Sequence, residues 1–177
     1  MPSITVIGSV NLDIVAKAAR LPAPGETVTG AELFRYPGGK GANQALAARR
    51  LGADVTLVAR VGDDAAADEA LALLRNEGVD LSQCVALPAI PTGTALIAVA
   101  PSGENQIVVA PGANRHLAPD DTDIPATDAL ICQLEVPVDT VAKVAAEFPG
   151  FLAVNLAPAC LLYTSPSPRD HLAHLVC

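Results

Sequence analysis

Residues 37–45 form a glycine-rich stretch, PGGKGANQA, immediately before a predicted helix. Glycine lets the backbone approach a ligand closely, and the first turn of a helix presents N–H groups that lack intrahelical partners. Lys40 and Asn43 add side-chain donors to the same turn. This combination is typical of a loop that binds a polar ligand.

The stretch differs from two familiar glycine-rich nucleotide motifs. A P-loop has Ser or Thr after its lysine, whereas Lys40 is followed by Gly41. The GxGxxG spacing of dinucleotide-binding loops is also missing after the preceding strand. The sequence therefore disfavours a nucleotide-phosphate role for this loop.

Asn11 and Asp13 follow the first predicted strand, residues 4–8, and we expect them in a loop over residues 9–13. Open α/β sheets bind ligands beyond the carboxyl ends of their strands. A carboxylate can accept hydrogen bonds from two vicinal hydroxyls, and an amide beside it can both donate and accept. The pair suits a neutral polyol, with a turn-capping role for Asp13 as the alternative.

Glu135 is a third polar residue at the end of a predicted strand. It follows the apolar run 129–134 and precedes Pro137. A single Glu in such a place is usually solvated. In the company of Asn11, Asp13 and Lys40 it becomes a candidate acceptor for a sugar hydroxyl.

The elements that must position these side chains alternate between strands and helices. The hydrophobic pattern also predicts an exposed strand or hairpin over residues 26–36. Asp63 and Asp64 are interpreted as loop and helix-capping residues, and Gly52 and Gly78 as the residues that end helices. We expect strands at 4–8, 55–59, 94–100, 106–110, 129–134 and 151–156, and helices at 41–51, from about 64, and at 138–148. This order predicts an α/β fold with helices packed on a sheet.

Composition narrows the class of protein. The chain has 177 residues, of which 51% are apolar and only 3% aromatic, so a core of Ala, Val, Leu and Ile is expected. The net charge of −8, with scattered cations, argues against nucleic acid as a partner. No apolar run approaches the roughly 20 residues that span a bilayer. Residues 3–10 also lack the basic start of a signal peptide, so we expect a cytoplasmic protein without membrane association.

The four cysteines show no zinc-binding pattern. They have neither CxxC spacing nor a nearby His partner of the kind that zinc sites show. Buried or incidental thiols in a reducing compartment are the favoured interpretation. They are Cys84, Cys132, Cys160 and Cys177.

Six short motifs occur in an order that resembles the ribokinase branch of the PfkB carbohydrate kinase family. The similarity covers about residues 3–159, and an ordered set is far more specific than one motif. The motifs are GSVNLD (8–13), PGETV (24–28), GGKGANQA (38–45), VGDD (61–64), PGAN (111–114) and NLAPA (155–159).

The resemblance implies a ribokinase-like α/β fold, with a central, mostly parallel sheet flanked by helices and a small β lid. Residues 1–159 would be the N-terminal part of the kinase domain, with lid segments at about 10–37 and 92–112. It also implies a set of sugar-binding residues, with apolar pocket walls at Ala95 and Ile97. The set is Asn11, Leu12, Asp13, Gly39, Lys40, Gly41, Ala42, Asn43, Ala95, Ile97 and Glu135.

The activity implied by the resemblance is ATP-dependent phosphorylation of D-ribose at its 5-hydroxyl, with Mg²⁺ and the monovalent cation K⁺ as cofactors. Fructokinase and nucleoside kinase are alternatives within the family. A homodimer formed through the lid, with a strand near residues 32–36 at its edge, is also implied. From a different class, a glycine-loop nucleotide-binding or regulatory module remains an alternative.

The catalytic part of the family pattern is not found. Family members carry a catalytic Asp in a Gly-Ala-Gly-Asp motif downstream, and no such motif precedes Cys177. We therefore expect the C-terminal part of the fold to be absent and the chain itself to be inactive, a fragment that keeps the sugar-binding residues. Residues 160–177 include two prolines within three positions and are expected to be a non-native tail.

Overall fold

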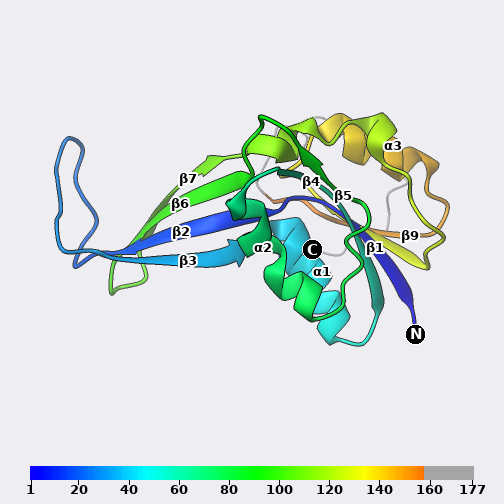
Figure 1. Cartoon of the computed structure of the whole chain (residues 1–177), viewed down its shortest axis with the longest axis horizontal. Coiled ribbons are helices and arrows are strands. Elements are labelled where there is room, and N and C mark those ends of the chain that lie inside the picture. Colours follow the sequence, from blue (N-terminus) through cyan, green and yellow to red (C-terminus); the bar gives the residue numbers. More distant parts are fainter. Residues whose placement is uncertain (158–177) are drawn as a thin grey trace.

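The computed structural model describes residues 1–157 as two β-sheets with helices packed on the larger one (Figure 1). The larger sheet has the strand order β5-β4-β1-β8-β9, and the smaller has the order β3-β2-β6-β7. The elements are β1 (Ser3–Ile7), β2 (Asn11–Lys17), β3 (Glu32–Gly38), α1 (Lys40–Arg50), β4 (Asp54–Gly62), α2 (Ala65–Asn76), β5 (Cys84–Leu87), β6 (Gly93–Val99), β7 (Asn105–Ala110), two 3₁₀ turns η1 (Gly112–His116) and η2 (Pro119–Asp121), β8 (Ala129–Gln133), α3 (Val138–Glu147) and β9 (Phe151–Asn155).

Every named pairing in the larger sheet is parallel, and β1 lies between β4 and β8. Because alternate residues of a strand point to opposite faces, β1 contributes to two separate cores. Val6 packs with Leu57 and Ala45 on the side of α1 and α2, whereas Ile7 packs with Leu130 on the side of α3. The predicted α/β fold with a parallel sheet flanked by helices is confirmed.

The helix boundaries follow the predicted signals. Asp64 caps α2, because its carboxylate accepts a hydrogen bond from Ala67 N at 2.9 Å. Gly52 and Gly78 follow the C-terminal ends of α1 and α2 with φ of 94° and 76°, values that favour glycine. The capping interpretation of Asp64 is therefore confirmed.

The smaller sheet extends away from the rest of the molecule in Figure 1. β2 pairs with β3 in antiparallel and with β6 in parallel orientation, and β7 completes the sheet antiparallel to β6. Every residue of β7 is exposed. The α2 helix contacts β2 and β3, α1 also contacts β3, and η1 contacts β6, so the smaller sheet is joined to the helical layer of the larger one.

Three expectations from the sequence need correction. Asn11 and Asp13 lie on β2 rather than in a loop, because the chain leaves β1 and enters the second sheet after only three residues. In the segment 26–36, only the part from Glu32 onward is a strand, and it continues to Gly38. β5 was not predicted. The tail 160–177, with Cys160 and Cys177, lies outside the described residues.

Burial determines the protonation state of the two cysteines within residues 1–157. Cys132 is buried and Cys84 is largely so, and both are free thiols. Burial raises the pKa of each to about 12, with the nearby Asp80 carboxylate adding to the effect at Cys84. Both thiols are therefore protonated at neutral pH. Within the same residues, no helix combines the length and apolarity needed to cross a bilayer.

Candidate functional site

The predicted site residues converge where the two sheets meet. The carboxyl ends of β1 and β8 are adjacent because these strands are parallel neighbours. After β1, the chain passes directly into β2, whose first residue Asn11 pairs with Gly38 at the end of β3. The α1 helix begins two residues later, at Lys40. Three stretches that are distant in sequence, namely the passage from β1 to β2, the passage from β3 to α1 and the end of β8, therefore meet at one junction.

Glu135 binds the first turn of α1. Its Oε2 accepts hydrogen bonds from Ser9 Oγ at 2.6 Å and from Lys40 N at 3.0 Å. Ser9 extends the contact, since its Oγ accepts from Gly41 N at 3.3 Å and its carbonyl accepts from Ala42 N at 2.9 Å. A carboxylate at the N-terminus of a helix is stabilised by the helix dipole. Glu135 is thus a structural anchor of α1 as well as a candidate ligand group.

This anchoring occupies the donors that a phosphate would need. The backbone N–H groups of Lys40, Gly41 and Ala42 all have acceptors within the protein. An anion-binding helix terminus uses free N–H groups of this kind. The residues at the start of α1 therefore do not fit a nucleotide phosphate, which agrees with the absence of the P-loop pattern.

Asp13 lies close to two other charged groups. Its carboxylate packs against Gly38 so tightly that a Cβ there would lie 2.3 Å from Asp13 Oδ1. Burial raises the pKa of Asp13, the negative charge of Glu135 raises it further, and the positive charge of Lys40 opposes both. Lys40 Nζ is itself 3.6 Å from Glu135 Oε1. The junction therefore holds two carboxylates and one ammonium group.

Asn11 is almost completely buried beside this cluster. Its Oδ1 accepts a hydrogen bond from Asn114 Nδ2 at 2.8 Å, and in the part of the chain that the structure describes its Nδ2 has no hydrogen-bond partner. Gly93 makes the contact between the two amides possible, because a Cβ at this position would lie 2.2 Å from both Asn11 Oδ1 and Asn114 Nδ2. The Asn11 amide thus retains a free donor.

The remaining predicted residues lie at different depths. Ala95 is the register partner of Asp13 on β6 and is buried, and Ile97 lies two residues further along the same face. Asn43 is exposed in the first turn of α1. Leu12 is buried and, by the alternation of strand residues, points to the face of β2 opposite to Asp13. The structure does not bring Leu12 together with the polar cluster.

Three residues of this junction were missed by the sequence analysis. Ser9 and Asn114 lie within quoted motifs, GSVNLD and PGAN, but their partners are 126 and 103 residues away. Gln133 is fully buried and donates from Nε2 to Ile7 O at 3.0 Å. A Cβ on Gly8 would overlap this amide. No local signal identifies such contacts.

The arrangement as a whole matches a ligand that both donates and accepts hydrogen bonds. Asp13 and Glu135 Oε1 are acceptors, while Lys40 Nζ and Asn11 Nδ2 are donors. Hydroxyl groups can satisfy both kinds of partner. Within residues 1–157, no group of three or more His, Cys, Asp and Glu side chains is placed to hold a metal ion.

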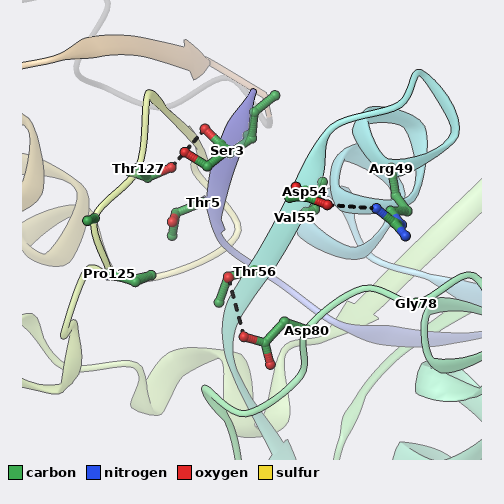
Figure 2. A pocket seen from close by; sticks show the side chains of 12 residues that line it. Ser3, Thr5, Arg49, Asp54, Val55, Thr56, Gly78, Asp80, Pro125 and Thr127 are labelled. Atoms are coloured by element: carbon green, nitrogen blue, oxygen red, sulfur yellow. Dashed lines mark hydrogen bonds and ion pairs between the residues drawn. The ribbon is translucent and has the colours of Figure 1, made fainter. Parts of the chain in front are cut away.

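A separate cavity lies at the opposite edge of the larger sheet, at the amino ends of β1 and β4 (Figure 2). It has a volume of about 260 Å³ and contains none of the predicted site residues. Arg49 Nη1 there pairs with Asp54 Oδ1 at 3.1 Å, and Thr56 Oγ1 is 3.5 Å from Asp80 Oδ2. Parallel sheets bind ligands at their carboxyl edge, so the junction remains the candidate site.

Comparison with known proteins identifies the family. Residues 1–150 match the pfkB family carbohydrate kinases. The chain is 39% identical over 168 residues to a ribokinase from Haemophilus influenzae, covering 90% of this chain and 55% of the relative. It is 41% identical over 149 residues to a ribokinase from Bacillus subtilis, covering 81% and 50%. A deoxyribokinase from Salmonella typhi is 37% identical over 143 residues, covering 78% and 47%.

Solved structures show the same fold. The crystal structure of a ribokinase from Thermotoga maritima superposes with a TM-score of 0.83 at 34% identity, covering 90% of this chain and 54% of that one. A ribokinase from Arabidopsis thaliana complexed with ribose and ATP gives a TM-score of 0.71 at 28% identity, covering 88% and 54%. The chain thus spans about half the length of the relatives it matches.

Proposed function

Because the chain belongs to the pfkB family of carbohydrate kinases, we propose that it forms the sugar-binding part of a ribokinase, which phosphorylates D-ribose at its 5-hydroxyl with ATP. The observation that carries this proposal is the junction of the two sheets, where Asp13, Lys40 and Glu135 gather beside the free amide donor of Asn11. The two ribokinases that are 39% and 41% identical to this chain support ribose as the sugar.

In this proposal the site binds and orients the sugar. Asp13 accepts hydrogen bonds from sugar hydroxyls, and Asn11 Nδ2, Lys40 Nζ and Asn43 donate hydrogen bonds to hydroxyl oxygens. Ala95 and Ile97 form the apolar side of the pocket, together with the backbone of Gly39, Gly41 and Ala42. Fixing one hydroxyl relative to a phosphoryl donor removes much of the entropic barrier to transfer.

The smaller sheet acts as the lid of this site. Its face bearing Asp13 and Ala95 continues outward along β2 and β6 from the polar cluster. A lid that covers the sugar excludes water, which would otherwise compete with the hydroxyl as phosphoryl acceptor. The lid segments correspond to about residues 10–37 and 92–112.

ATP, Mg²⁺ and K⁺ belong to the whole-protein reaction. The first turn of α1 does not fit the phosphates of ATP, since its N–H groups are bonded to Glu135 and Ser9, and no cluster of His, Cys, Asp and Glu side chains that could hold Mg²⁺ lies within residues 1–157. No catalytic step is therefore assigned to Asp13, Glu135 or Lys40. We propose that the 177-residue chain binds sugar without phosphorylating it, in the cytoplasm where ATP is available.

The exposed apolar surface of the lid supports a homodimer. Leu33 and Val108 are 68% and 67% exposed on the smaller sheet. Ile107 and Val109 on β7 are also exposed, so apolar side chains lie on both faces of this strand. A monomer seldom leaves such a surface uncovered. Sedimentation should show a dimer that Val108→Asp dissociates; a monomeric wild-type chain would contradict the proposal.

The alternatives within the family differ in the sugar. The deoxyribokinase at 37% identity favours 2-deoxy-D-ribose as a second candidate. Fructose and adenosine represent the fructokinase and nucleoside kinase alternatives. A nucleotide-binding module without sugar binding is the alternative from another class.

Calorimetric titration of the chain with D-ribose, 2-deoxy-D-ribose, D-fructose and adenosine separates these functions. D-ribose should bind most tightly, and Asp13→Ala should abolish its binding. Asp123→Ala is the matched control, because Asp123 is exposed and outside the junction. Unchanged ribose affinity in Asp13→Ala would overturn the site assignment. Formation of ribose 5-phosphate from ATP by the purified chain would overturn the proposed inactivity.

A further inference from the structure

Asn114 is a buried amide outside the predicted site that contacts the site directly. It lies in η1, is 2% exposed, and is 103 residues from its partner Asn11 in sequence. All its side-chain hydrogen bonds go to two consecutive residues, Val10 and Asn11. The Asn114 amide therefore belongs to the segment that joins the two sheets.

The backbone of Val10 determines the orientation of the Asn114 amide. Asn114 Oδ1 accepts from Val10 N at 2.9 Å, and Asn114 Nδ2 donates to Val10 O at 3.1 Å. Val10 lies between β1 and β2, so the amide supplies the partners that a neighbouring strand would otherwise provide. Rotating the amide by 180° would place oxygen against oxygen and N–H against N–H. Only one orientation is therefore stable.

Asn114 in turn determines the orientation of the Asn11 amide. With Asn114 Nδ2 fixed as a donor, the atom 2.8 Å away on Asn11 must be its acceptor, Oδ1. The Nδ2 of Asn11 then remains as a pair of donors without a partner among residues 1–157. Gly93 leaves the space in which the two amides meet.

We propose that Asn114 is a positioning residue that holds the Asn11 amide with its Nδ2 toward the sugar. The position between Asn11 and Asp13 then selects a group that can both accept and donate a hydrogen bond. A hydroxyl between Asn11 and Asp13 accepts from the amide and donates to the carboxylate. An ammonium group at the same place has no lone pair for Asn11 and is rejected. The inference rests on the proposed function, because it takes the ligand to be a sugar.

A double-mutant cycle on the chain tests the coupling between the two amides. Titration with D-ribose should show about tenfold weaker binding for Asn114→Ala, the loss typical of one misdirected hydrogen bond. In the Asn11→Ala background the same substitution should have no further effect. Thr127→Val is the matched control, since it removes 3.0 Å hydrogen bonds to Ser3 O and Ala129 O at the amino ends of β1 and β8, the edge of the larger sheet opposite to the junction, and should leave ribose affinity unchanged.

The proposal would be overturned if Asn114→Ala lowered ribose affinity equally in the wild-type and the Asn11→Ala backgrounds. Unchanged ribose affinity of Asn114→Ala alone would also overturn it. Asn114→Asp provides a second test that preserves shape. Its carboxylate can only accept, so Asn11 should turn its Nδ2 inward and ribose affinity should fall at least as far as in Asn114→Ala.

Side-chain amide resonances provide a readout that needs no variant. In the wild-type chain, the hydrogen-bonded Nδ2 protons of Asn114 should be more strongly protected from exchange than those of Asn11, and the Asn11 resonances should shift when ribose is added. Stronger protection at Asn11 than at Asn114 in the free chain would contradict the proposal. Absence of binding by every sugar tested would instead contradict the proposed function, while the free-chain exchange pattern would still decide the amide orientation.

Discussion

Replacement of Glu135 by Gln tests the central contact of the junction. The substitution keeps the shape of the side chain and a neutral oxygen acceptor for Ser9 Oγ and Lys40 N, which now bond to Oε2 at 2.6 and 3.0 Å. It removes the negative charge from the N-terminus of α1. It also leaves Lys40 Nζ without its carboxylate partner at 3.6 Å.

The expected loss follows from these contacts. Hydrogen bonds to charged groups contribute about 1.5–3 kcal/mol and neutral ones about 0.5–1.5 kcal/mol, so the two bonds together weaken by about 2 kcal/mol. The anion at the helix terminus contributes about a further 0.3–1 kcal/mol. Relief of the repulsion between Glu135 and Asp13 offsets part of this, which leaves a net destabilisation of about 1–2 kcal/mol.

Thermal and urea unfolding of Glu135→Gln measure this loss directly. For a chain of this size, a loss of about 1–2 kcal/mol lowers Tm by about 2–8 °C. Glu69→Gln is the control, because it removes an exposed ion pair with Arg35 that contributes at most about 1 kcal/mol. Equal stability of Glu135→Gln and wild type would refute the conclusion that Glu135 anchors α1.

Three further outcomes are expected. Asp13→Asn should stabilise the chain at pH 7, because the raised pKa of Asp13 means that its ionised form destabilises the fold; the gain should shrink as the pH falls through the raised pKa and vanish below the ordinary value of 3.8 in melts at low pH, and calorimetry should show lost sugar binding. Asp64→Ala should cost about 2 kcal/mol in urea unfolding, since it removes a helix cap and two hydrogen bonds from Thr92; a cost below that of an ordinary surface substitution would contradict this. Cys84 and Cys132 should resist thiol labelling at pH 8 until the chain is unfolded, as measured by peptide mass spectrometry; rapid native labelling would contradict their burial.

Hydrophobic periodicity was sufficient to predict most of the larger sheet and its helices. The run 55–59 and the stripe around Ala70 and Leu74 have simple strand and helix patterns, and both became core elements. β5 escaped prediction because its four residues are too short to show a period. The helix ends were predictable because Asp64, Gly52 and Gly78 act through local backbone chemistry.

The second sheet was less predictable at β2. The β-branched run of β1 ends at Gly8, and Asn and Asp are residue types that strands disfavour, so the sequence predicts a loop at Asn11 and Asp13. Tertiary pairing to β3 on one side and β6 on the other overrides this preference. The polar cluster itself was expected from Asn11, Asp13, Lys40 and Glu135, whereas the support from Ser9 and Asn114 depends on contacts more than 100 residues apart in sequence.

The most direct test of the sugar site is a map of backbone amide shifts in the isotopically labelled chain during titration with D-ribose. The account predicts the largest shifts at Asn11, Asp13, Gly39 and Glu135, where the two sheets meet. Shifts confined to the cavity around Thr5 and Thr56 at the opposite edge of the sheet (Figure 2), or no shifts at saturating ribose, would contradict it.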